Sequence, residues 1–243
     1  MERPSETISV VSYNIHRFVG TDRRFDPERI ARVIHECRAE IVGLQEIDTH
    51  FYRNGNQIEH LARTTRLEVV HGPTRWNRNG HYGNALLTSF PVSDVRRIDL
   101  TVPGREPRGA LDVDLLAGGC RVRVIVAHLG LNILERRLQV KRLLDIFSAE
   151  RDRMEIMLGD FNEWIPVGRP LCWVNRFFGK PPALRTFPSF MPVLPLDRIW
   201  IRPLDALVEL SVYRTPLSRV ASDHLPVKAV VVPGGKPEIG CAC

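Results

Sequence analysis

The chain has 243 residues, of which 44% are hydrophobic and 26% charged, a balance that suits one large folded domain with an ample core. No apolar run approaches the ~20 residues that a transmembrane helix needs, so we expect no membrane-spanning segment. An excess of 34 Lys and Arg over 28 Asp and Glu gives a net charge of +6, which favours an acidic partner such as a phosphate ester, nucleic acid or anionic lipid surface.

The cysteines and the amino-terminal residues indicate in which cellular compartment the protein is expected. The five cysteines are odd in number and widely spaced, so they resemble neither a zinc-binding framework nor a disulfide scaffold. The first ten residues, MERPSETISV, are charged and lack the apolar core of a signal peptide. We therefore expect a cytoplasmic protein, and we interpret residues 233–243, with Cys241 and Cys243, as a frayed tail.

The first part of the chain combines predicted strands with predicted helices. β-Branched and apolar residues predict a strand over Ile8–Ile15. The stretch Asp26-Pro27-Glu28 offers an N-cap, a first-turn proline and an early acid, which together predict a helix. A second strand over Glu40–Glu46 and a second helix over Gln57–Arg66 follow. The inner face of the first helix is predicted to carry Ile30, Val33, Ile34 and Cys37.

Further strands dominate the rest of the chain. A helix is predicted over Glu135–Ser148, with apolar residues at helical spacing. The proline-rich segment 166–195 is predicted to be irregular, and loops of that length are often functional or mobile. Many strands with helices between some of them predict two packed sheets covered by helices, in one domain over residues 1–243 with its core at about 8–232. The additional predicted strands are Tyr82–Ser89, Val95–Leu100, Ala110–Leu115, Val122–His128, Met154–Leu158, Arg198–Ile201, Leu207–Val212 and Val227–Val232.

Polar side chains stand where the apolar strands begin or end. The stretch IMLGDFNEW is apolar up to Gly159 and then places Asp160 and Asn162 two residues apart, which lets both side chains point the same way. Each such residue alone is a weak signal, since an Asn is usually a turn former and a lone His is usually a satisfied hydrogen-bonding residue. Their number favours a site. The other members are Asn14, Glu46, His128, Asp197, Asp223 and His224.

Short motifs follow one another in a fixed order along residues 8–232. They are Ser12-Tyr13-Asn14, Leu44-Gln45-Glu46, Gly83-Asn84-Ala85, Arg108-Gly109, Ala127-His128-Leu129, Gly159-Asp160-Phe161-Asn162, Leu196-Asp197-Arg198-Ile199 and Ser222-Asp223-His224-Leu225-Pro226. The set resembles the endonuclease/exonuclease/phosphatase superfamily. That resemblance implies an α/β fold, a four-layer α/β/β/α sandwich of two mixed, mainly antiparallel sheets, with the site at one edge of both sheets. It also implies Mg²⁺- or Mn²⁺-dependent cleavage of phosphoester bonds.

The resemblance also implies roles for the polar residues. Glu46 would be the principal metal ligand, because a hard carboxylate suits Mg²⁺, with Asn14 and Asp223 in or near the same shell. Asp160 would orient or deprotonate the attacking water, and Asn162 would hydrogen-bond a phosphoryl oxygen.

A histidine–aspartate pair is implied beside them. His224 would bind the scissile phosphate or act as an acid–base group, with Asp197 fixing its tautomer and raising its basicity. Whether Asp160 or His224 is the base stays open at this point, as does the number of metal ions.

His128 discriminates between branches of the superfamily. The abasic-site nucleases carry a tyrosine at this place, whereas the deoxyribonuclease-like and sphingomyelinase-like branches carry a histidine, often cast as the general acid for the leaving oxygen. The alternative is a histidine bonded to a backbone carbonyl. Arg108 is a candidate for substrate binding, against a plain strand-edge arginine. Asn84 is a second candidate there, against a turn residue.

Three substrate classes are compatible with this pattern. Nucleic acid ranks first, because of the basic balance and the mixed basic and aromatic loop Arg75–Tyr82, with endo- and exo-cleavage both open. Phospholipid ranks second, because the His128 branch includes sphingomyelinase-like enzymes and the aromatics of residues 173–192 could enter a lipid interface. A soluble phosphomonoester ranks third. A non-catalytic binding protein is the remaining alternative, and the oligomeric state stays open.

Overall fold

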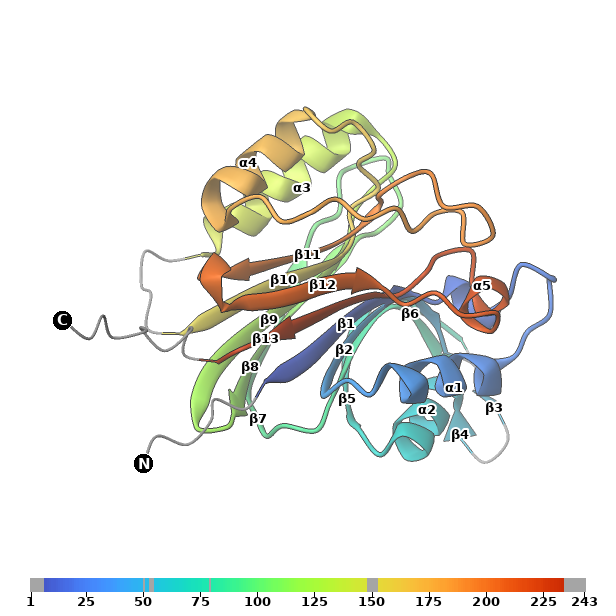
Figure 1. The fold of residues 1–243 in the computed structure, drawn as a ribbon. Coiled ribbons are helices and arrows are strands. Elements are labelled where there is room, and N and C mark those ends of the chain that lie inside the picture. The colour runs from blue at the N-terminus through green and yellow to red at the C-terminus, as the bar shows by residue number, and fades with distance from the viewer. Residues whose placement is uncertain (1–6, 50, 53–54, 79, 148–152, 234–243) are drawn as a thin grey trace, which may run out of the picture.

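Two β-sheets lie face to face in the computed structural model, which describes residues 7–49, 51–52, 55–78, 80–147 and 153–233 (Figure 1). In spatial order, one sheet contains β12 (Leu207–Val212), β13 (Val227–Val231), β1 (Ile8–Asn14), β2 (Ile41–Asp48), β6 (Gly80–Thr88) and β5 (Glu68–Asn77). The other contains β11 (Asp197–Arg202), β10 (Met154–Asp160), β9 (Cys120–His128), β8 (Gly109–Ala117) and β7 (Val92–Asp99).

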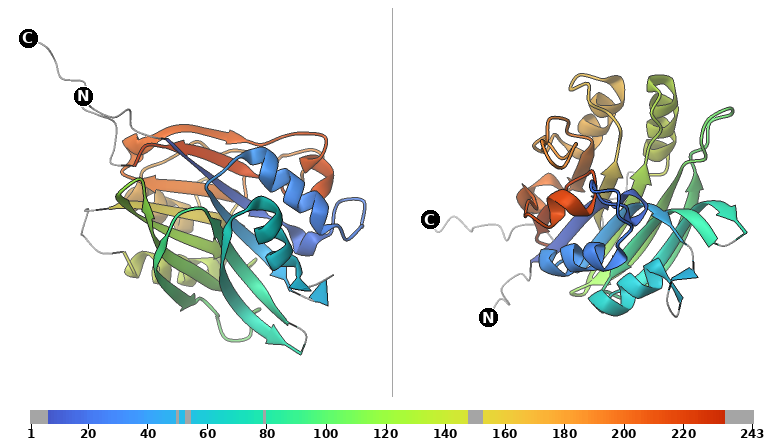
Figure 2. Two further views of the ribbon diagram at one scale, coloured as in Figure 1. Left: turned by 90° about the horizontal axis from the view of Figure 1, so that it is seen from below. Right: turned by 90° about the vertical axis from the view of Figure 1, so that its right-hand side faces the viewer.

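Helices cover the outer face of each sheet. The helices α1 (Pro27–Cys37) and α2 (Gln57–Thr65) pack on the first sheet, and α3 (Ile133–Asp145) and α4 (Arg169–Phe178) pack on the second (Figures 1 and 2). β1 pairs with β2 and β9 with β10 in parallel, while the other neighbours in the two sheets are antiparallel. The expected four-layer sandwich of mixed, mainly antiparallel sheets is confirmed.

The innermost core lies between the sheets and consists of their inward-facing aliphatic side chains. Val10, Val126 and Leu158 are among its fully buried members. Burial of such a side chain is worth roughly 1.5–3 kcal/mol. Gly43 sets how closely the sheets approach, because a Cβ at this position would lie 2.1 Å from Cδ1 of Leu158. The tight core fixes the relative position of the two sheets, and with it the spacing of the polar residues at their shared edge.

The helix signals in the sequence correspond to real caps. The side chain of Asp26 accepts a hydrogen bond from the backbone N–H of Arg29 at 3.0 Å, and Pro27 occupies the first turn of α1. Asn56 and Glu59 form a reciprocal capping box at the start of α2. The helix α3 begins two residues before the predicted Glu135, after the cap Asn132, and ends at Asp145; the predicted end at Ser148 falls outside the described residues.

Seven elements were absent from the sequence prediction, three of them short: the helix α5 (Ser218–Ala221) and two 3-10 helices over His16–Phe18 and Leu204–Ala206. The other four are α4, β5 and the strands β3 (Phe51–Tyr52) and β4 (Gly55–Asn56), which form a further hairpin. The helix α4 lies inside segment 166–195, where Pro170 occupies the first turn, a position that needs no N–H partner. The strand β5 was missed because Gly72 and Pro73 interrupt it. Of the helices in the described ranges, none offers an apolar length that would reach across a bilayer. The predicted tail falls, from residue 234 on, outside those ranges.

The predicted loop Arg75–Tyr82 is also different in the structure. It is the end of the β5–β6 hairpin, in which Arg75 pairs with Tyr82 and Trp76 with His81. Because neighbouring residues of a strand point to opposite faces, Arg75 and Trp76 lie on different faces of the hairpin. Arg75 lies over the ring of Tyr82, 5.6 Å from its centre. The ring centres of Trp76 and His81 are 5.2 Å apart, so the basic and aromatic groups are divided between the two faces.

Candidate active site

Three predicted residues stand in one row across the second sheet. The register pairs Asp160 with Asp197 on one side and with His128 on the other, so the neighbouring strands β11, β10 and β9 each contribute one polar side chain at the same level. All three are buried. Gly159 permits this row, because its φ is +145° and a Cβ would lie 1.8 Å from the carbonyl oxygen of Ala127.

The first sheet contributes Asn14 and Glu46 to the same centre. Nδ2 of Asn14, at the end of β1, donates to Oε1 of Glu46 at 3.2 Å and to Oδ2 of Asp160 at 3.0 Å. Glu46 sits where the register of β2 against β6 shifts, with φ +57°. A bulge re-aims a side chain, and a left-handed non-glycine residue stores strain that recurs at functional sites. The geometry thus brings carboxylates from both sheets to one amide.

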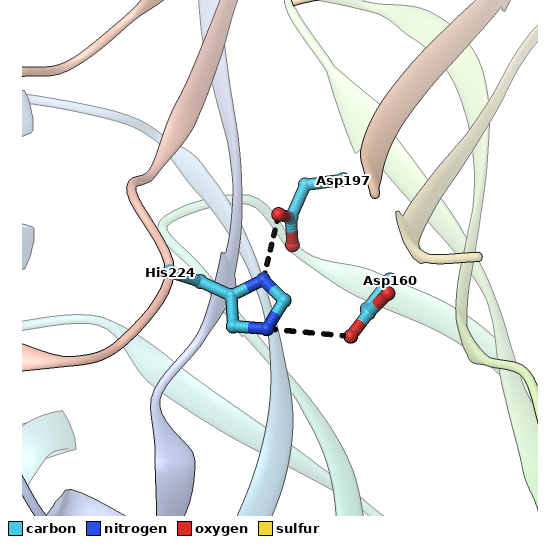
Figure 3. Close-up of side chains that lie close together, drawn as sticks. All are labelled: Asp160, Asp197 and His224. Atoms are coloured by element: carbon cyan, nitrogen blue, oxygen red, sulfur yellow. Dashed lines mark hydrogen bonds and ion pairs between the residues drawn. The ribbon is translucent and has the colours of Figure 1, made fainter. Parts of the chain in front are cut away.

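His224 lies between two aspartates (Figure 3). Its Nδ1 is 2.8 Å from Oδ2 of Asp197, and its Nε2 is 3.7 Å from Oδ2 of Asp160. Burial by itself would lower the pKa of this histidine, but the carboxylates of Asp197 and Asp160 outweigh it and raise the pKa to about 10. His224 is therefore a cation at neutral pH. Asp197 also accepts a hydrogen bond from the hydroxyl of Thr186.

His128 faces the same carboxylate but has the opposite charge preference. Its Nε2 is 3.6 Å from Oδ2 of Asp160 and 4.0 Å from Oε1 of Glu46. Nη1 of Arg108 lies 2.8 Å from Nδ1 and 3.2 Å from Nε2 of the ring. Burial is the main cause that holds the pKa of His128 well below its usual range, with the Arg108 guanidinium and His224 adding to it. A guanidinium only donates and a carboxylate only accepts, so the neutral tautomer that suits both neighbours carries its proton on Nε2, facing Asp160, and accepts from Arg108 at Nδ1.

Asp160 is the point on which these groups converge. Burial is the main cause that raises the pKa of its carboxyl to about 6, although the His224 cation and hydrogen bonds from Asn162 and Asn14 act against the shift. Oδ1 accepts from the backbone N–H of Asn162 at 2.9 Å, which leaves Oδ2 facing both imidazoles. At neutral pH the carboxylate is ionised and is a stronger base than an ordinary aspartate.

The remaining predicted residues lie around this centre. Nδ2 of Asn162 donates to the carbonyl of Leu129 at 2.9 Å, and one amide hydrogen stays available for another acceptor. Asn84 donates to the carbonyl of Gly109, next to Arg108, at 2.9 Å. The partly exposed side chain of Asp223 is 3.4 Å from Oγ of Ser222 and 3.9 Å from Nδ1 of His16.

Two buried groups at the site were not predicted from the sequence. Thr186 supports Asp197, and its only sequence signal is its place in the segment that leads into β11. Arg136 is fully buried in α3; its Nε donates to Oε2 of Glu163 at 3.1 Å and its Nη1 to the carbonyl of Leu131 at 2.6 Å. The helical period places Arg136 on the inner face of α3, which was the available signal.

A hard divalent cation fits better between Glu46 and Asp160 than among Asp160, Asp197 and His224. Glu46 and Asp160 turn carboxylate oxygens toward the same amide of Asn14, and oxygen donors are what Mg²⁺ and Mn²⁺ prefer. Asp160, Asp197 and His224 also form a compact group, with ligand atoms within 4.8 Å of one another. In that group Nδ1 of the imidazole is already bonded to Asp197, so only Nε2 could face a cation.

Known proteins share both the sequence pattern and the fold. The family model described as the endonuclease/exonuclease/phosphatase family matches residues 11–224. The chain is 29% identical to an uncharacterized protein, YbhP, of Escherichia coli strain K12, over 93% of this chain and 96% of that protein.

Solved structures agree. A functionally unknown conserved protein from Enterococcus faecalis superposes with a TM-score of 0.77 at 17% identity, over 94% of this chain and 100% of that one. An endonuclease/exonuclease/phosphatase from Beutenbergia cavernae superposes with a TM-score of 0.74 at 21% identity, over 96% of this chain and 73% of that one. At such identities the likeness concerns the fold.

Proposed function

The chain belongs to the endonuclease/exonuclease/phosphatase family, and from this premise we propose that it is a divalent-metal-dependent phosphodiesterase. The observation that carries the proposal is the placement of Oδ2 of Asp160 between a cationic and a neutral imidazole, within reach of the Asn14 amide and beside Glu46. A phosphodiester is anionic, so its hydrolysis needs charge neutralisation, a base for water and a donor for the leaving oxygen. This group of side chains supplies all three.

A metal ion fits the oxygen donors at this centre. Glu46 and Asp160 would hold it, with Asp223 near the same shell as the family pattern implies. Asn14, predicted as a further ligand, turns its Nδ2 to both carboxylates and its Oδ1 to the backbone N–H of His16, so it would position the carboxylates. When bound, Mg²⁺ or Mn²⁺ would supply charge neutralisation on the phosphoryl oxygens and lower the pKa of a bound water.

Asp160 and His224 have separate roles in the reaction. The water oxygen forms a bond to phosphorus, and its proton passes to Oδ2 of Asp160. The phosphorus–oxygen bond to the leaving group breaks, and its electron pair goes to the leaving oxygen, which takes a proton from solvent. The raised pKa of Asp160 supports it as the base, whereas His224, already protonated and held by Asp197, is suited to bind the phosphate as a cation. This favours Asp160 over His224 for the role that the sequence left open.

His128 and Arg108 lie beside Asp160 and would meet the leaving oxygen. A neutral His128 with its proton on Nε2 can donate a hydrogen bond to the leaving oxygen, and Arg108 holds that tautomer. Asn162 has one amide hydrogen left for a phosphoryl oxygen. Asn84 supports the backbone beside Arg108 and is proposed to act only through it.

The net charge and the surface around the site bear on which phosphate ester is the substrate. On the net charge of +6 alone, nucleic acid is the first candidate. One specific observation favours a phospholipid as the second candidate: exposed apolar side chains are concentrated on the connections that surround the site. A phosphomonoester has no such observation in its support.

The test is hydrolysis of a soluble aryl phosphodiester by the purified protein, after EDTA treatment and with Mg²⁺ or Mn²⁺ added back. We expect activity only with metal, and a loss of about a hundredfold or more in Asp160→Asn. The matched control is Asp205→Asn, the same change at an exposed residue. A wild-type protein that stays inert with both metals, or an Asp160→Asn variant as active as the control, would refute the proposal.

A further inference from the structure

Exposed apolar side chains cluster on the three connections that follow or precede the site residues. These segments, called the mouth loops, are residues 129–138 after His128, 161–169 after Asp160, and 184–196 before Asp197. The first includes residues 133–138 at the start of α3, and the second ends at the first residue of α4. Of the fifteen exposed large hydrophobic side chains in the described ranges, nine lie on them. Apolar residues scattered singly on a surface need no explanation, but a concentration at one place marks an interaction site. The nine are Leu131, Ile133, Leu134, Leu138, Trp164, Val167, Phe190, Met191 and Val193.

The topology places all three mouth loops at one end of the second sheet. β9 and β10 are parallel and β11 is antiparallel to β10, so the carboxyl ends of the first two and the start of the third coincide. In Figure 1 the connections into α3, into α4 and into β11 lie toward the same upper right-hand end. An object that rests on these loops therefore rests on the opening of the site.

The mouth loops are fastened to the catalytic centre and to one another. Arg136 links the first two, because it donates to the carbonyl of Leu131 at 2.6 Å and to Glu163 at 3.1 Å, and its guanidinium lies 5.1 Å from the ring centre of Trp164. The third is joined to the residues before β13: the N–H of Ser189 donates to the carbonyl of Asp223 at 2.7 Å. The exposed apolar groups thus sit on loops held by buried polar contacts.

The charges of the mouth loops are of one sign at the surface. Their acidic residues, Glu135 and Glu163, are both buried. The charged residues of the mouth loops that reach solvent are all arginines: Arg169 and Arg185 are exposed, and Arg137 is partly exposed. An apolar surface bordered by arginines, with its acids turned inward, complements an anionic lipid surface, in which acyl chains accept the apolar groups and headgroups attract the cations.

We propose that the mouth loops dock the protein on the surface of an anionic phospholipid bilayer, so that the phosphodiester of a lipid headgroup enters the site. Docking in this orientation presents the headgroup to Asp160 while Leu131, Val167 and Phe190 enter the boundary between headgroups and acyl chains. This inference rests on the proposed phosphodiesterase function for its substrate, whereas the docking itself is a property of the surface. Nucleic acid and a protein partner are the competing occupants.

The test is flotation of the full-length protein with vesicles, in EDTA so that no turnover intervenes. Vesicles of phosphatidylcholine with phosphatidylglycerol should bind the wild type, and vesicles of phosphatidylcholine alone should bind it much less. The double variant Leu131→Asp/Val167→Asp, at side chains 66% and 81% exposed, should bind the anionic vesicles at least about tenfold more weakly. The independent variant Phe190→Asp on the third loop should weaken binding in the same direction.

The matched control is Leu116→Asp, the same change at a residue 47% exposed where β8 ends, at the opposite end of the sheet. It should bind vesicles like the wild type. The docking is refuted if the wild type does not float with anionic vesicles, or if Leu131→Asp/Val167→Asp and Phe190→Asp float as the control does. It is also refuted if these variants leave vesicle binding intact and weaken binding of a single-stranded oligonucleotide instead.

Measurement of diester hydrolysis distinguishes membrane docking from the phosphodiesterase function. Wild-type activity on the soluble aryl diester, with no binding to vesicles, would remove the docking and leave the phosphodiesterase. Vesicle binding without metal-dependent activity on any diester would do the reverse. If both hold, the double variant should lose more activity on phosphatidylglycerol vesicles than on the soluble diester, and equal losses would contradict a docking role.

Discussion

His128 and His224 face the same oxygen of Asp160 from two sides and yet differ in charge. Both are buried, and their Nε2 atoms lie 3.6 and 3.7 Å from Oδ2 of that carboxylate. The other ring nitrogen makes the difference: Nδ1 of His224 meets the carboxylate of Asp197, and Nδ1 of His128 meets the guanidinium of Arg108. The pKa of His224 is raised to about 10 and that of His128 is held well below its usual range.

Burial lowers the pKa of both imidazoles, and the Asp197 carboxylate at the second ring nitrogen is the contact that most sets His224 apart, with Asp160 adding to the rise. One site thereby keeps a fixed cation and a neutral donor a short distance apart at neutral pH. Such a pair can bind an anionic phosphate and donate to a leaving oxygen without either histidine changing its charge.

The largest expected effect comes from Asp197→Asn, which removes the contact that keeps His224 cationic. Without that carboxylate, burial lowers the pKa of His224, and the fixed cation is lost. We expect kcat on an aryl phosphodiester to fall by about a hundredfold to ten-thousandfold. Steady-state kinetics and an NMR titration of His224 measure both parts, with the exposed Asp205→Asn as control. A His224 that stays protonated in Asp197→Asn would show that Asp197 does not set its charge.

Arg108→Gln alters the other side of the comparison and should have a smaller effect. Removal of the guanidinium takes away one cause of the lowered pKa of His128, but burial, the main cause, remains. The tautomer is then less strictly held, so we expect kcat to fall by about tenfold to a hundredfold, with a smaller change in KM. Arg32→Gln, an exposed change on α1, is the control. A change confined to KM would make Arg108 a phosphate anchor instead.

The fold was largely accessible from the sequence because its strands and caps have local signals. The cap and first-turn proline Asp26-Pro27 predicted α1, and the family resemblance rested on the order of the polar residues at the strand ends. The helix α4 was missed because the prolines of segment 166–195 suggested irregular chain, although Pro170 is compatible with a first turn. The strand β5 was missed because Gly72 and Pro73 hide its period.

The sequence predicted which residues form the site, but it did not predict which of them are charged. His128 and His224 look alike in sequence, each a histidine at a strand end. Their difference arises from Arg108 and Asp197, which lie 20 and 27 positions away along the chain. Burial, which is the first cause in both histidines, is also a property of the packed sheets. A single sequence has no signal for either.

The difference in charge between His224 and His128 also predicts how the stability of the protein depends on pH, which can be measured without any catalysis. His224 keeps its proton up to a pKa of about 10 in the folded protein, against 6.5 for an ordinary histidine. Its contacts with Asp197 and Asp160 therefore contribute stability that is complete below pH 6.5 and is lost as the pH rises toward 10. In EDTA the Tm should fall over this window, by about 2–4 °C for each kcal/mol lost. His224→Gln should lack this component of the decrease, whereas His128→Gln should retain it.

The smallest expected effect belongs to Thr186→Val, which leaves both histidines and both charged partners in place. The substitution keeps the shape of the side chain and removes the hydroxyl that donates to Asp197. One hydrogen bond to a carboxylate that is already paired is worth about 1 kcal/mol, so kcat should fall by about fivefold and the pKa of His224 should rise slightly. The pKa should rise because an Asp197 with one donor fewer holds the imidazolium proton more strongly. Thr186→Ser keeps the hydroxyl and should restore both values; if Ser behaved like Val, the effect would come from packing around the methyl group and not from the hydrogen bond.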